Sequence, residues 1–170
     1  MEGGLFQAIS VIVMENHIDG AVLDPRLKDL LARWRQARGG RRMPRPGDFS
    51  LVDLPDLMAN LLLVEVVWPG PRFRYRRVGR ALGRFVAIDV ENRFVDEMPN
   101  RFYRRIAGQA YQEVLDSRAP TYAVRTFIQD FWFARYERLL LPASEDDHAV
   151  DAVLGAIYPV IRRRAEGMQG

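Results

Sequence analysis

Cysteine is absent from the 170-residue chain, and lysine is almost absent. Without cysteine the chain can form no disulfide, thiolate metal site, cysteine nucleophile or thioether-linked chromophore. A disulfide-stabilised secreted scaffold is therefore excluded, and we expect a cytoplasmic protein. Lys28 is the one lysine among 25 basic residues, so the other 24 are arginines.

Long apolar runs are also missing. The apolar stretch near the N-terminus, residues 5–14, is interrupted by Gln7 and Ser10, and a membrane-spanning helix needs about 20 apolar residues. Glu2 is the one charge before this stretch, so it lacks the basic segment of a secretory signal. We expect no membrane partner.

Positive charge is in only small excess: 25 basic and 22 acidic residues give a net charge of +3. The arginines are scattered over several predicted elements and interleaved with acids, and no helix-turn-helix pattern follows. We expect them on the outer faces of helices and strands, which disfavours nucleic acid as a partner. Hydrophobic residues make up 48% of the chain, enough for one globular core.

An amphipathic helix is predicted near the start. Asp24-Pro25 is typical of a helix N-terminus, and Gly39-Gly40 ends the helix. The following segment, to Gly47, reads as a linker. Apolar residues fall at i, i+3, i+4 and i+7, and we expect them to form an interface: Leu27, Leu30, Leu31 and Trp34.

Five strands and a long helix follow. The strands are predicted at 61–67, 73–78, 121–129, 132–141 and 148–158, and the helix at 100–117. This order predicts an α+β fold, a five-stranded antiparallel sheet with the long helix and short helices on one face. The N-terminal amphipathic helix, a second subunit, or both would cover the other face. The predicted segments are an extension (1–23, strand or helix), helix and linker (24–47), the main domain (48–160) and a basic tail (161–170).

The order and spacing of these stretches resemble the PAS domain family. The resemblance is to the small bacterial proteins in which one PAS domain makes up nearly the whole chain, and it covers about residues 24–160. The stretches that carry it are Asp24-Pro25-Arg26-Leu27 leading to Trp34, Gly39-Gly40-Arg41-Arg42-Met43-Pro44, Leu54-Pro55-Asp56-Leu57, Arg72-Phe73-Arg74-Tyr75-Arg76-Arg77-Val78-Gly79, Tyr136-Glu137-Arg138-Leu139-Leu140-Leu141-Pro142 and Val150-Asp151-Ala152-Val153-Leu154-Gly155-Ala156. It implies a sensory or protein-interaction module, with the long helix lining a pocket.

The resemblance directs attention to residues that could line such a pocket. The candidates are Tyr75, Tyr103, Ile106, Ala107, Ala110, Tyr111 and Tyr136. Ala107 and Ala110 favour a cavity because they are small and face inward one turn apart. The alternative is a closed core in which the tyrosine hydroxyls reach water or backbone.

The cofactor stays unknown. Flavin photosensors that form a cysteine adduct and cysteine-linked chromophores of this fold are excluded by the lack of cysteine. Haem would need an axial histidine, but His17 lies in the extension and His148 at a strand edge. Asp146-Asp147-His148 falls in a predicted turn where acidic residues are common, so we expect no metal. A flavin or small metabolite held non-covalently needs no signature residue.

Three functions remain from the sequence. We favour a non-enzymatic signalling module, a homodimer that binds a protein partner in trans and a small ligand, because no output segment is recognised. A small-molecule enzyme of an α+β cone fold would need a carboxylate facing a cavity, for which Glu65, Glu137 and Asp56 are candidates. The third is a nucleic-acid-binding regulator.

Overall fold

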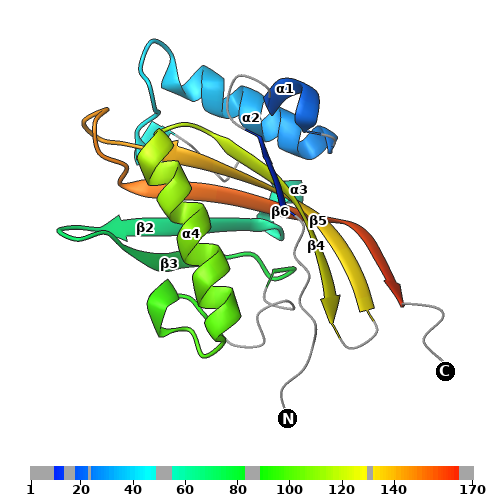
Figure 1. Cartoon of the computed structure of the whole chain (residues 1–170). Helices are drawn as coiled ribbons and strands as arrows, with labels where there is room; N and C mark the ends of the chain where they lie inside the picture. The colour runs from blue at the N-terminus through cyan, green and yellow to red at the C-terminus, as the bar shows by residue number, and fades with distance from the viewer. Residues whose placement is uncertain are drawn as a thin grey trace.

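The computed structural model describes residues 10–13, 18–22, 24–48, 55–82, 89–129 and 132–164. They form an antiparallel sheet with helices against both faces (Figure 1). In chain order the elements are β1 (Ser10–Val13), α1 (Ile18–Ala21), α2 (Pro25–Arg38), η2 (Pro46–Asp48), α3 (Pro55–Met58), β2 (Leu61–Val67), β3 (Arg72–Val78), η4 (Val95–Glu97), α4 (Arg101–Ser117), β4 (Thr121–Gln129), β5 (Trp132–Ala143) and β6 (Ala152–Arg164).

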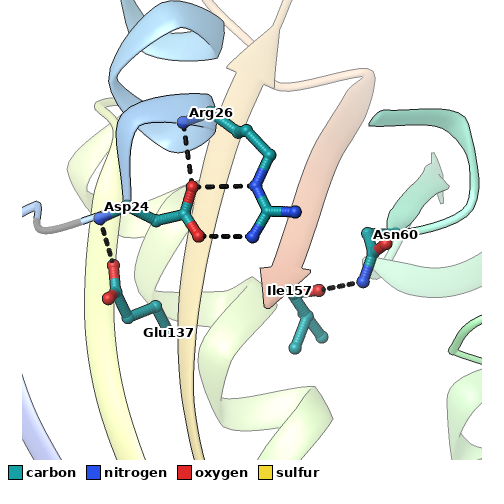
Figure 2. Close-up of polar contacts among 5 residues, drawn as sticks. All are labelled: Asp24, Arg26, Asn60, Glu137 and Ile157. Atoms are coloured by element: carbon teal, nitrogen blue, oxygen red, sulfur yellow. Dashed lines mark hydrogen bonds and ion pairs between the residues drawn. The ribbon is translucent and has the colours of Figure 1, made fainter. Parts of the chain in front are cut away.

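The strands lie side by side in the order β1-β4-β5-β6-β2-β3. The five strands expected from the sequence all form, which confirms the predicted α+β fold. The sixth strand, β1, comes from the N-terminal extension and pairs with β4, where Ser10 lies opposite Arg125. At the start of β2, the side-chain amide of Asn60 donates to the carbonyl of Ile157 at 2.8 Å, which ties β2 to β6 (Figure 2).

The last strand differs from its prediction, because β6 covers residues 152–164 instead of 148–158. A turn occupies the residues before it. The carboxylate of Asp146 accepts the backbone N–H groups of His148 and Ala149 at 2.8 and 2.9 Å. These bonds hold the backbone in the turn, so strand pairing begins only after it.

Alternate residues of a strand point to opposite sides of the sheet, so the register assigns side chains to two faces. The face called the α4 face below carries Val64, Tyr75, Ala123, Arg125, Tyr136, Arg138, Leu140 and Val153. The opposite face, called the α2 face, carries Tyr122, Glu137, Leu139, Leu141, Ala156 and Tyr158.

The long helix α4 crosses the α4 face, in front of the sheet in Figure 1. It begins at Asn100, whose side chain accepts the N–H of Tyr103 at 2.9 Å. The ring of Tyr111 packs against those of Phe73 and Tyr75, with centroids 5.3 and 6.3 Å apart. This contact fixes α4 over β3.

The N-terminus of α2 is fixed on the α2 face by polar contacts (Figure 2). The carboxylate of Asp24 accepts the N–H of Arg26 at 2.9 Å and caps the helix. Its own backbone N–H donates to Glu137 on β5 at 3.1 Å. The cap predicted from Asp24-Pro25 is therefore also the point where the helix joins the sheet.

The apolar stripe of α2 is buried within the chain. Its members are at most 2% exposed: Leu27, Leu30, Leu31 and Trp34. The indole N–H of Trp34 donates to the carbonyl of Pro142 at 2.7 Å. Burying each such side chain contributes about 1.5–3 kcal/mol. The interface expected from these residues is thus made with the sheet of their own chain, and it leaves none of the stripe exposed for a second subunit.

The segment after α2, expected as a linker, is attached to the turn between β5 and β6. The carboxylate of Asp147 accepts the N–H groups of Arg42 and Met43 at 3.1 and 2.9 Å. The guanidinium of Arg41 donates to the carbonyl of Ser144 at 2.8 Å. These bonds fix the path of the chain out of α2. In the described part of the chain, no helix is both long and apolar enough to cross a bilayer.

Candidate functional site

Three of the tyrosines predicted to line a pocket meet beneath α4. The hydroxyl of Tyr75 lies 2.6 Å from that of Tyr103 and accepts from that of Tyr111 at 3.1 Å. Three hydroxyls carry three protons, and two hydrogen bonds use two of them. One hydroxyl proton of the cluster therefore remains for another acceptor.

Burial strengthens the ordinary preference of these tyrosines for the neutral form. It raises the pKa of Tyr75, and the neighbouring Tyr111 and Tyr103 raise it further. Burial also raises the pKa of Tyr103 and of Tyr111. The pKa of Tyr136 is raised by burial, while the nearby cations Arg138 and Arg125 oppose the rise. The cluster is therefore an uncharged set of hydroxyl donors near neutral pH.

The other candidates lie on α4 itself. Ala107 is 9% exposed and Ala110 is 1% exposed, and Ile106 is half-buried. Two surface hollows, of about 450 and 530 Å³, are lined by other residues of the described chain. An open pocket at the seven predicted residues therefore stays a prediction.

Two arginines share this layer, and sequence reasoning missed both. Arg125 is 7% exposed and Arg138 is 5% exposed, so the prediction that the arginines lie on outer faces is wrong for this pair. Arg125 lies opposite Tyr136 and Arg138 opposite Ala123, which makes the arginines diagonal neighbours on the α4 face. Strand alternation was the available signal, since Arg138 falls between the inward residues Tyr136 and Leu140.

The two guanidinium groups have no carboxylate partner among the residues that the structure describes. The Nε atoms of Arg125 and Arg138 are shielded from solvent and have no hydrogen-bond acceptor there. Burial lowers the pKa of Arg138, and the adjacent cation of Arg125 lowers it further. An arginine nevertheless stays protonated at neutral pH. Two positive charges are thus held together in the interior.

Glu113 of α4 is an acidic group that acts on Arg138. It raises the pKa of Arg138, as Tyr136 and Tyr111 do, against the larger effect of burial. Its Oε2 atom is buried and has no hydrogen-bond partner among the described residues. Among these three described groups, two cations and one anion sum to a charge of +1.

The carboxylates considered for catalysis lie elsewhere. Glu65 pairs with Arg74 and Arg76 at 2.7 and 2.9 Å. Glu137 is buried on the α2 face, where it accepts the N–H of Asp24. The side chain of Asp56 lies outside the described residues.

The histidines and the acidic turn provide no metal centre in the described part of the chain. His17 lies outside the described residues, and His148 is exposed. Backbone hydrogen bonds from His148 and Ala149 lower the pKa of Asp146 to about 2. The acidic residues of this turn thus bind backbone N–H groups.

Comparison with known proteins identifies the fold family. A PAS domain family model matches residues 23–158, and no curated protein matches the chain. One solved structure, "Structure of an RNA-binding Light-Oxygen-Voltage Receptor", is similar at 13% identity and a TM-score of 0.44, and the match covers 92% of this chain and 40% of that chain. This chain thus spans less than half of that protein, and so distant a likeness carries no argument about ligand or partner. Because the family model matches most of its length, the chain belongs to the PAS domain family.

Proposed function

We propose that the chain is a non-enzymatic PAS sensory module that holds a small ligand non-covalently beneath α4 and signals by binding a protein partner. PAS domains are sensory modules that commonly mediate protein interactions and dimerise, which supports a homodimer. The ligand site consists of the tyrosines and small residues on the facing surfaces of α4 and the sheet.

The observation that carries the proposal is the polar layer beneath α4. Phenylalanine would fill a closed structural core equally well, and it has no hydroxyl that needs a hydrogen-bond partner. Here the hydroxyls of Tyr75, Tyr103 and Tyr111 form a chain with one proton left to donate. A ligand bound there would contact α4 and the sheet together, so its presence would alter how α4 packs.

The alternatives gain less support. An enzyme needs an acid or base facing its substrate, but Glu65 is held in ion pairs and Glu137 faces α2. A nucleic-acid interface needs free surface cations, whereas Arg72 is paired with Asp96 at 2.8 Å. Duplex DNA binding with a steep salt dependence would restore the third function.

Native mass spectrometry of freshly purified full-length protein tests the proposal. We expect a dimer mass and a retained small molecule. Tyr75→Phe should lose the ligand, while the matched control Tyr158→Phe, on the α2 face, should keep it. A monomer without ligand that captures no protein partner would overturn the proposal, as would equal ligand retention in both variants.

A further inference from the structure

We infer that the site beneath α4 binds an oxyanion, a phosphate or carboxylate group of a small ligand, against Arg125 and Arg138. This inference rests on the proposed ligand-binding function and adds the chemical class of the ligand. Two buried cations, Arg125 and Arg138, form no ion pair with the residues that the structure describes.

Burying two cations side by side is unfavourable unless anions or acceptors compensate them. Arg125 and Arg138 are 7% and 5% exposed, and each has a buried Nε without an acceptor among the described residues. Their mutual repulsion adds to the cost of desolvation. A bound oxyanion would offset both terms, because it supplies negative charge and acceptor lone pairs at one place.

The two guanidinium groups are well placed for one oxyanion. They come from adjacent strands and are diagonal neighbours on the same face. A guanidinium presents a planar set of donors that matches the oxygen atoms of a phosphate or carboxylate. The remaining hydroxyl proton of the Tyr75 cluster is a further donor on the same face. The site therefore offers donors and positive charge, as an oxyanion requires.

Three other arginines of the described chain show how a carboxylate can compensate a cation. Arg35 pairs with Asp19 at 2.6 Å, and Arg72 with Asp96 at 2.8 Å, although these arginines lie nearer the solvent. On the α2 face, Arg26 pairs with Asp24 at 2.7 Å and stacks 3.7 Å from the ring centroid of Tyr158. In these three cases a carboxylate of the chain compensates the cation, whereas neither buried arginine forms an ion pair within the described residues.

Glu113 is the competing anion. Its carboxylate acts on Arg138 from α4 but forms no ion pair with it within the described residues, and its Oε2 atom also lacks a partner. An incoming oxyanion would experience repulsion from this carboxylate. Removing the charge of Glu113 should therefore strengthen oxyanion binding.

The test uses the full chain, unfolded in urea, freed of small molecules by desalting and refolded. Binding of inorganic phosphate and of acetate is measured by calorimetry at constant ionic strength, with chloride as the replaced anion. We expect at least one of the two to bind the wild type. Arg125→Met and Arg138→Met should each weaken binding about 10- to 100-fold, the range for a hydrogen bond to a charged group. Arg138→Lys should give an intermediate loss, since it keeps the charge without the planar donor set, and Glu113→Gln should bind more tightly.

The matched control is Arg77→Met, which removes an exposed arginine from β3 and should bind as the wild type does. Equal weakening in Arg77→Met, or no binding of either anion to the wild type, would overturn the inference. Should Arg138→Met fail to fold, Arg138→Lys and Glu113→Gln still decide, because unchanged affinity in both would overturn it. A retained neutral molecule with no oxyanion binding would refute this inference and leave the proposed function intact. Oxyanion binding by a monomer that captures no protein partner would support this inference and refute the proposed signalling function.

Discussion

Each face of the sheet is covered by a helix, but the two faces differ in the partners of their buried charged side chains. On the α2 face the buried carboxylate of Glu137 accepts the N–H of Asp24, and Arg26 pairs with the carboxylate of Asp24. On the α4 face Arg125 and Arg138 are buried without a carboxylate partner in the described chain. The two faces both bury charged side chains, but within the described residues they differ in how these charges are compensated.

The difference is sharpest at two consecutive residues of β5. Glu137 and Arg138 are 2% and 5% exposed and point to opposite faces. Glu137 has a donor from the helix that covers it, whereas Arg138 faces another cation. Within the described residues, Glu137 has a hydrogen-bond donor and Arg138 has no ion-pair partner.

The largest effect should follow from removing residues 24–38, which would uncover the α2 face. The truncated chain should associate or lose solubility, because the apolar surface under α2 would meet water. Light scattering after size exclusion measures the mass in solution. An unchanged mass and solubility would contradict the placement of α2 as the cover of this face.

A milder change to the same contact is the control for that deletion. Trp34→Ala should lower the free energy of unfolding by about 3–5 kcal/mol, since the side chain is 1% exposed and its indole N–H donates to Pro142. Trp68 is 47% exposed, so Trp68→Ala should lower the free energy of unfolding much less.

Changes at the two consecutive residues of β5 should have opposite signs. Glu137→Ala should destabilise the ligand-free protein by about 1–3 kcal/mol, because it leaves the N–H of Asp24 without its acceptor. Arg138→Met should be neutral or stabilising, since it removes an uncompensated buried charge. Urea unfolding measures both. A strong destabilisation by Arg138→Met would mean that the chain itself compensates this arginine.

Tyr75→Phe should have a smaller effect, a loss of about 1–2 kcal/mol in the free energy of unfolding. The hydroxyl of Tyr75 makes both hydrogen bonds of the tyrosine cluster, so its removal separates Tyr103 from Tyr111. Tyr103→Phe removes one bond and should cost less. Equal costs in urea unfolding would argue against Tyr75 as the centre of the cluster.

The smallest effect on the free energy of unfolding should come from a change in the β5–β6 turn. This turn lies outside both faces and serves as a reference for them. The pKa of Asp146 is lowered from 3.8 to about 2 by backbone hydrogen bonds, so its contribution to stability is present above pH 3.8 and is lost as the pH falls toward 2. Asp146→Asn should show a shallower fall in unfolding free energy over this range. An equally steep fall in Asp146→Asn and in the wild type would contradict this prediction.

The periodic elements could be predicted from the sequence because each has a local signal. The stripe of Leu27, Leu30, Leu31 and Trp34 predicts a covered helix, and it lies buried on the sheet. β1 had no such signal, because a four-residue strand is specified by pairing with β4 far along the chain. Arg125 and Arg138 were missed because the general preference of charged residues for the surface outweighed strand alternation.

The edges of the sheet limit how two copies could associate. β1 pairs with β4 along residues 122–125, and on the outer side of β3 the N–H of Tyr75 donates to the carbonyl of Arg93 at 3.0 Å. The N–H of Asn92 donates to the carbonyl of Tyr75 at 2.7 Å. β1 itself has only four residues, and short edge strands discourage further pairing. Copies of this chain should therefore meet through side chains of helices and loops, without extending the sheet from one molecule into the next.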